Sequence, residues 1–183
     1  GSYVKLAGLV RSLKIEDQGS GSQADATAWG VSASTKLVMD NGDDLRAMVN
    51  YGDGIGRYVG LSFVLDGYIH DETGDIETAE SLYWFVAYRH MCNDKWRSNI
   101  MYGTNSIDDT DDFDADGFND SASSFHFNLI YNVLPKLDIG AEIIWGEREV
   151  IDIIPDLNNP GEELRSSQDG DFTRFMLSAK YAF

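Results

Sequence analysis

The chain has 183 residues, of which 31 are acidic and 14 basic, and its formal net charge is −17. This charge argues against nucleic acid as a partner, and the hydrophobic content of 43% argues against intrinsic disorder. The length predicts a single domain over residues 1–183. No apolar run reaches the roughly 18 residues that a membrane-spanning helix needs. The single cysteine, Cys92, excludes an intramolecular disulfide.

Eight segments of strand length follow one another along the chain, at residues 3–15, 27–39, 45–51, 82–92, 96–104, 125–133, 137–149 and 171–183. Short turns at 40–43, 93–94 and 134–135 alternate with long connections at 16–26, 52–80, 105–121 and 150–170. Asn41-Gly42 in the first turn is a strong hairpin signal. Residues 59–69 are apolar enough to form a further strand, which would change this count.

Strict alternation of apolar and polar residues is clearest in the last segment. Phe175, Leu177, Tyr181 and Phe183 fall on one face, and Arg174 and Lys180 fall on the other. Outer-membrane barrels combine such strands with short periplasmic turns and long external loops. The sequence therefore predicts an all-β fold, a transmembrane antiparallel β-barrel with eight strands in this chain. The alternative is a soluble β-sandwich, which would bury the aromatic faces between two sheets.

Most basic residues fall on the face that such a barrel turns towards its lumen. The set is Lys5, Arg11, Lys36, Arg46, Arg89, Lys95, Arg97, Arg148, Arg174 and Lys180. Cations that line a constriction lower the electrostatic barrier for anions. The sequence thus predicts a path for anions, unless these cations only pair with Asp138, Glu142 and carboxylates of the loops.

The acidic connection between residues 105 and 121 carries a candidate metal site. Asp112, Asp114, Asp116 and Asp120, with Gly117 between the last two, match the opening of an EF-hand calcium loop. The twelfth position is Ser123, where that motif has a bidentate Glu, and flanking helices are missing. The residues predict a weak Ca²⁺ site, and the favoured alternative is a solvated external loop without any cofactor.

A second loop, residues 51–58, carries glycines at positions 52, 54 and 56. No amphipathic helix follows it, which excludes a phosphate-binding loop. We expect the glycines to let this connection bend sharply and fold into the lumen, with Arg57 as its functional side chain. No enzyme is predicted, because the spacing of His70, His90 and His126 suggests no catalytic triad, although triads assemble in space.

Several stretches of the chain are similar to the DcaP-like trimeric outer-membrane porin family. They are residues 41–46 (NGDDLR), 50–58 (NYGDGIGRY), 85–90 (FVAYRH), 128–131 (NLIY), 137–142 (LDIGAE), 146–149 (GERE) and 175–183 (FMLSAKYAF). The resemblance implies a trimeric diffusion channel for small organic acids. It also implies that arginines select the solute, at positions that correspond to Arg11, Arg46, Arg89, Arg97, Arg148 and Arg174.

The family differs from this chain in length, since its members are about twice as long and have roughly sixteen strands. The chain resembles their carboxyl-terminal half. Eight strands that close alone leave an interior only wide enough for side chains. The fold is therefore expected to be either a closed small barrel or half of a larger porin barrel, and an exported chain would be a mature form or a fragment.

The sequence as a whole predicts an outer-membrane porin of a Gram-negative bacterium, for passive diffusion of small anionic solutes through a cation-lined lumen. Its expected partners are membrane lipid, the solute and further copies of the chain. The predicted selectivity residues are Arg11, Arg46, Arg57, Arg89, Arg97, Arg148, Arg174 and Lys180. The alternative function is a small non-conducting barrel that acts as a structural or adhesion scaffold through its acidic loops.

Overall fold

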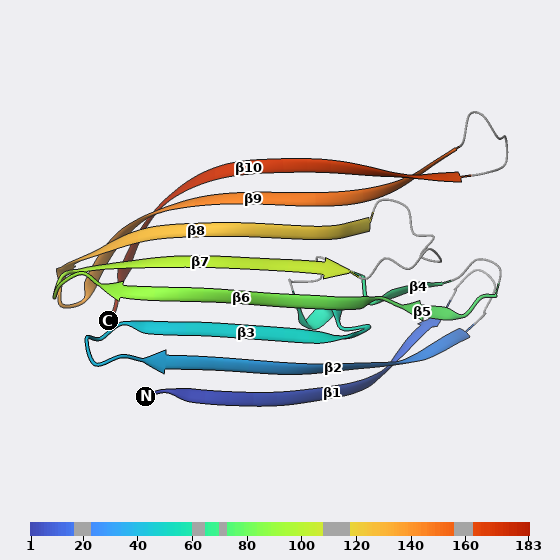
Figure 1. The fold of residues 1–183 in the computed structure, drawn as a ribbon, viewed down its shortest axis with the longest axis horizontal. Coiled ribbons are helices and arrows are strands. Elements are labelled where there is room, and N and C mark those ends of the chain that lie inside the picture. The colour runs from blue at the N-terminus through green and yellow to red at the C-terminus, as the bar shows by residue number, and fades with distance from the viewer. Residues whose placement is uncertain (17–22, 60–64, 70–72, 108–117, 156–162) are drawn as a thin grey trace.

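The computed structural model describes residues 1–16, 23–59, 65–69, 73–107, 118–155 and 163–183. Eight antiparallel strands form one sheet in the order β1-β2-β3-β6-β7-β8-β9-β10 (Figure 1). Their bounds are β1 Tyr3–Glu16, β2 Gln23–Val38, β3 Asp44–Asp53, β6 Glu80–Met91, β7 Trp96–Ile107, β8 Phe118–Leu134, β9 Leu137–Pro155 and β10 Glu163–Tyr181. Two short strands, β4 (Gly67–Ile69) and β5 (Ile76–Thr78), pair with each other outside this sheet.

The register of the sheet keeps one side apolar across its whole width. Directly paired residues of antiparallel strands share a face, so each pairing can be followed from strand to strand. Val86 pairs with Tyr102, Tyr102 with Phe125, and Phe125 with Trp145. We call this side the apolar face. The opposite side carries the residues that alternate with these along each strand, and we call it the polar side.

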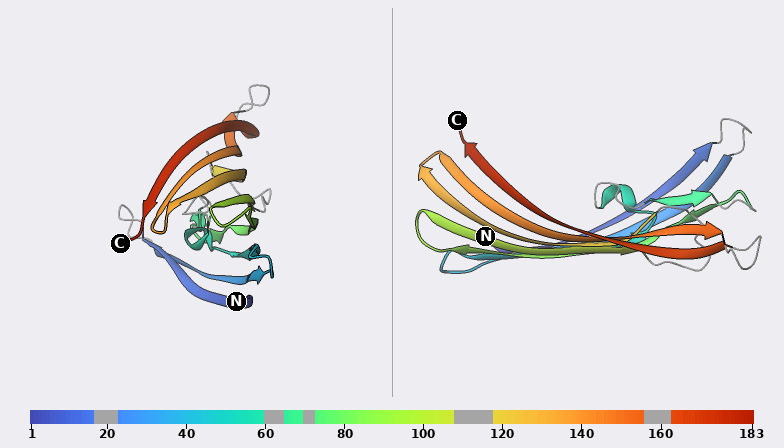
Figure 2. Two further views of the ribbon diagram at one scale, coloured as in Figure 1. Left: turned by 90° about the vertical axis from the view of Figure 1, so that its left-hand side faces the viewer. Right: turned by 90° about the horizontal axis from the view of Figure 1, so that it is seen from above.

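The sheet curves, so that it has a concave and a convex side (Figure 2). The 3-10 helix η1 (Gly56–Tyr58) lies on this concave side, and the segment before it contacts the polar side chain of Arg11. We therefore call the polar side the concave face.

The sheet is open. Within the described residues, β1 pairs only with β2 and β10 only with β9, so both are edge strands. The closed small barrel that was one of the two expectations is not formed. The chain begins and ends at the end of the sheet that carries the short turns (Figure 1).

The expected eight strands are present, and each is longer than the apolar alternation predicted, most of all β8, β9 and β10. The predicted loop at 150–170 was wrong for most of its length, because β9 continues to Pro155 and β10 begins at Glu163. Strand β8 begins at Phe118, inside the predicted acidic connection. These extensions carry polar residues that pair across the ladder, such as Asp152 with Ser166. Backbone hydrogen bonds form the ladder, and they do not require apolar side chains.

The connection between β3 and β6, residues 54–79, is the third connection of the chain, and its described part packs on the concave face. Gly54 has a φ of 69°, and a Cβ on Gly30 would lie 2.8 Å from the Ile55 side chain. The glycines thus allow the sharp inward bend that the sequence predicted. The apolar residues 59–69 contribute only β4 to the described strands, and β4 does not join the main sheet.

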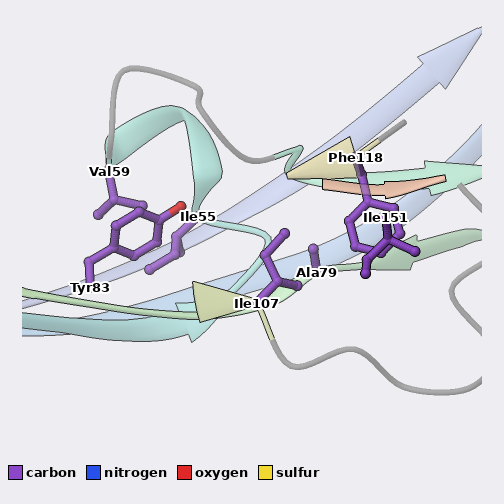
Figure 3. Close-up of a cluster of buried hydrophobic side chains, with 7 residues drawn as sticks. All are labelled: Ile55, Val59, Ala79, Tyr83, Ile107, Phe118 and Ile151. Carbon is purple, nitrogen blue, oxygen red and sulfur yellow. The ribbon is translucent and has the colours of Figure 1, made fainter. Parts of the chain in front are cut away.

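A small hydrophobic core lies beneath the third connection, at the end of the sheet away from the short turns. It consists of Ile55, Val59, Ala79, Tyr83, Ile107, Phe118 and Ile151 (Figure 3). The apolar face remains uncovered, with Phe127 38% and Leu177 88% exposed. A β-sandwich would bury these side chains. Within the described residues no second sheet covers them, and no helix there is long and apolar enough to cross a membrane.

Candidate functional site

The apolar face carries two lines of aromatic residues with aliphatic residues between them. One line contains the ring pairs Trp29–Tyr51, Trp84–Tyr102 and Phe125–Trp145, with centroids 5.4–5.7 Å apart. The other lies near the short turns and contains Trp96–Tyr131 and Tyr181–Phe183, with centroids 4.6 and 5.4 Å apart. Aromatic residues prefer the two interfaces of a bilayer, and aliphatic residues its centre.

The concave face carries the predicted cations. The register places Lys5, Arg11, Lys36, Arg46, Arg89, Arg97, Arg148, Arg174 and Lys180 on this one face. Lys95 was also predicted there, but it precedes β7 in the short turn after β6. Arg57 lies in η1 above the same face and is exposed. The strands thus place on one face residues that are up to 175 positions apart, from Lys5 to Lys180.

Several of these cations pair with carboxylates of the fold, as the alternative interpretation of the sequence expected. Arg97 Nη2 lies 2.7 Å from Asp138 Oδ2, and Asp138 also accepts a hydrogen bond from Asn132. Arg174, Lys180, Lys36 and Lys5 form no ion pair with any carboxylate of the described residues. The concave face therefore combines cations that the fold neutralises with cations that the described fold leaves unpaired.

Arg11 holds the third connection onto the concave face. Its guanidinium donates hydrogen bonds to the carbonyl oxygen of Gly54 at 2.6 and 3.2 Å. It also lies 2.6 Å from Asp66 Oδ2 and 5.1 Å from the centre of the Tyr58 ring. Asp66 Oδ1 accepts a hydrogen bond from the backbone N–H of Arg57. Arg11 thus has a structural role in positioning Arg57, which the sequence pattern alone did not reveal.

Two adjacent buried carboxylates, Asp43 and Asp44, organise the end of the sheet with the short turns. Each is only 1% exposed. Asp44 contacts Arg46 Nε at 2.7 Å and Arg89 Nη2 at 2.5 Å, so it holds two of the predicted selectivity residues side by side. The sequence pattern predicts a hairpin turn at Asp43 and gives no signal of this role for either carboxylate.

Asp43 joins the β2–β3 turn to the end of β6. It accepts hydrogen bonds from the Tyr88 hydroxyl at 2.5 Å, the Met91 backbone N–H at 2.7 Å and Asn41 Nδ2 at 2.8 Å, and it lies 3.0 Å from His90 Nδ1. The bond from Tyr88 contributes most to lowering the pKa of Asp43 well below its ordinary value of 3.8. A carboxylate with a lowered pKa stabilises the fold while it is ionised.

We expect stability to fall as the pH drops below 3.8, because protonation of Asp43 then favours the unfolded chain, in which its pKa is ordinary. Asp43→Asn should lower the urea midpoint at pH 7 and make the midpoint less dependent on pH in the acid range. The measurement is a series of unfolding titrations between neutral and acidic pH. Asp40→Asn, in the same turn but exposed, is the control. Parallel pH profiles for wild type and Asp43→Asn would contradict this role.

A hydrogen-bonded network crosses the concave face from β7 to β9. Asn99 Nδ2 donates to Asn128 Oδ1 at 2.5 Å, and Asn128 Nδ2 lies 3.5 Å from Glu142 Oε1. The same Glu142 oxygen lies 3.3 Å from His126 Nδ1, and His126 Nε2 lies 3.1 Å from the Ser124 hydroxyl. The structure therefore brings a serine, a histidine and a glutamate together. In the sequence, the only signal for this arrangement is that Ser124 and His126 are two positions apart on one strand.

The candidate calcium loop lies largely outside the described residues, which include none of Asp112, Asp114 and Asp116. Asp120 belongs to β8, at an irregularity in the register between Asn119 and Ser121. Within the described part of the chain, no group of three or more His, Cys, Asp or Glu side chains could hold a metal ion.

Comparison with known proteins gives one structural match for the whole chain. No protein-family model and no curated protein sequence matches. The fold is similar to the crystal structure of the outer membrane channel DcaP of Acinetobacter baumannii, with a TM-score of 0.68 and 19% sequence identity. The similarity covers 100% of this chain and 54% of that chain, so this chain spans about half the length of the channel. The resemblance seen in the sequence is therefore confirmed for the fold.

Proposed function

We propose that this chain forms part of the wall of a passive diffusion channel for small anionic organic solutes, in the outer membrane of a Gram-negative bacterium. The observation that carries the proposal is the contrast between the two faces of one sheet. The apolar face, with its two aromatic lines, suits the bilayer, and the concave face gathers the cations. The likeness of the fold to a known outer membrane channel supports it.

The open edges of the sheet indicate that further strands are needed to close a barrel. Strands β1 and β10 would expose unpaired backbone N–H and C=O groups to lipid, where each unsatisfied group costs several kcal/mol. These edges therefore need further antiparallel strands. We infer a wider barrel of roughly sixteen strands, whose lumen holds water rather than packed side chains.

Selectivity in this channel would depend on the balance of charges along the concave face. The opposite charges of Arg97 and Asp138 nearly cancel while both side chains are present. Cations without an ion pair among the described residues, such as Arg174 and Lys180, supply the positive potential that favours anions. Transport is passive, and the cations replace part of the hydration of the solute.

The test is the reversal potential in a planar bilayer under a salt gradient. We expect the channel to prefer chloride over potassium. Arg97→Ala should reduce this preference, because it leaves the Asp138 carboxylate uncompensated, and Asp138→Asn should increase it for the opposite reason. Lys136→Ala, in the exposed β8–β9 turn, should change nothing. Equal reversal potentials for Arg97→Ala and Asp138→Asn would refute the role of the concave face.

The alternative function, a non-conducting scaffold, would appear in the same experiment as correct insertion without conductance. The resemblance to trimeric porins also predicts that the inserted protein is a trimer. Its mass in detergent, measured by light scattering, tests this oligomeric state.

A further inference from the structure

We propose that Ser124, His126 and Glu142 form a catalytic triad that hydrolyses carboxylic esters on the concave face. Ser124 and His126 lie two residues apart on β8, and their side chains therefore share a face. Glu142 lies on the adjacent strand β9 and pairs directly with Asn128. The separations are 3.1 Å from Ser124 Oγ to His126 Nε2 and 3.3 Å from His126 Nδ1 to Glu142 Oε1.

These separations allow the roles of a triad, which is recognised by geometry rather than by sequence order. In the tautomer with the proton on Nδ1, His126 donates a hydrogen bond to Glu142, and this leaves Nε2 to accept the hydroxyl proton of Ser124. Distances near 3 Å are within the range of nucleophile–base pairs, which are often looser without substrate. Asn128, itself held by Asn99, orients Glu142.

The surroundings of Ser124 leave room for a substrate. Its two direct partners on the neighbouring strands are Gly103 and Gly146, which have no side chains, and the ring of Phe172 lies over Gly146. Ser124 lines a cavity of about 670 Å³, a size typical of small-molecule sites. Met48, Phe85 and Phe172 give this cavity apolar walls.

The cavity also holds polar groups that can bind a carbonyl oxygen. Asn105 and Arg148 line it. An arginine has five N–H donors, so it can donate hydrogen bonds to a ligand and to other protein groups at the same time. Tyr83 lines it too and is 7% exposed, and its hydroxyl has no hydrogen-bond partner among the described residues. Figure 3 shows the ring of Tyr83 standing away from β6, with its hydroxyl towards Ile55 and Val59. This combination fits a small ester with an apolar acyl group.

The reaction needs only the ester and water. Ser124 Oγ attacks the ester carbonyl carbon while His126 Nε2 takes the hydroxyl proton. The C–O bond to the alcohol breaks, and His126 returns the proton to the leaving alkoxide. Water then attacks the acyl-serine, with His126 again accepting and returning a proton, and it releases the carboxylic acid and regenerates Ser124. The product ionises to a small anion, which suits a cation-lined face.

The test uses the folded protein in detergent micelles with p-nitrophenyl butyrate as the ester and a fluorophosphonate as a probe of the active serine. We expect hydrolysis, with the probe attached to Ser124 in peptide mass spectrometry. Ser124→Ala and His126→Asn should each lower kcat/KM by about 100-fold or more. Glu142→Gln tests a positioning residue, and it should lower kcat while KM stays unchanged.

Ser34→Ala is the matched control, since Ser34 lies on the same face of the sheet but on β2, opposite Lys5. Wild-type rates in Ser124→Ala, or a probe that labels Ser34 and Ser124 alike, would overturn the proposal. Retention of the folded form in unheated gel electrophoresis shows that each variant is folded. If His126→Asn fails to fold, the hydrolysis rate of Ser124→Ala alone tests the proposal. The assay requires no conductance, so it is independent of the proposed channel.

Discussion

Replacing Phe127 by lysine is expected to prevent stable insertion of the sheet into a bilayer. Phe127 lies between the two aromatic lines of the apolar face, where it pairs with Ile100 and Ile143. A lysine on the lipid face of a barrel near the bilayer midplane costs about 2–4 kcal/mol. The measurement is refolding into phospholipid vesicles, followed by urea titration of the inserted form.

The neighbouring residue provides the control for this prediction. Asn128→Lys places the same charge one position away, on the concave face, where it meets Glu142. It should insert with a urea midpoint close to that of wild type. Insertion of both variants with equal stability would show that the apolar face does not contact lipid, and this would remove the basis of the proposed function.

Replacing Asp44 by asparagine is expected to destabilise the folded protein by about 2 kcal/mol. Removal of one partner from a buried charge pair costs roughly 3–5 kcal/mol when all charges are buried. Here solvent reaches the side chains of Arg46 and Arg89, which are 46% and 33% exposed, and it screens part of this cost. The measurement is the urea midpoint in detergent micelles.

The same variant has a second expected result, which distinguishes it from a general loss of stability. Asp44→Asn leaves both arginines without their carboxylate, so the anion preference in a planar bilayer should increase. Asp40→Asn, four positions earlier and exposed, should change neither stability nor selectivity. A preference that decreases in Asp44→Asn would contradict a lumenal position for Arg46 and Arg89.

The ion pairs change which of the predicted selectivity residues should matter most. Arg46, Arg89 and Arg97 each have a carboxylate partner, so their own replacement acts mainly by exposing that carboxylate. Arg174 and Lys180 lack such a partner among the described residues. The sequence placed all of these residues on one face, but it could not distinguish between the two groups.

The sequence by itself determined which residues share a face and where the short turns lie. Alternation of apolar and polar residues with a period of two is a local property, and it is visible in the sequence from Phe175 to Phe183 and from Phe125 to Val133. Asn41-Gly42 likewise specifies a tight turn from adjacent residues alone. These local signals also carried the resemblance to porins, which the structural comparison confirmed for the fold.

Only the tertiary structure decided where the long strands end and which side chains contact one another on the concave face. The ladder beyond Arg148 depends on backbone pairing between β9 and β10, which polar side chains neither specify nor prevent. Asp44 meets Arg89, and Ser124 meets His126 and Glu142, because register, curvature and rotamers set their distances. The tertiary structure also showed that β1 and β10 are open edges. The alternation of residues assigns two faces to each strand, but it does not determine how many strands close the barrel.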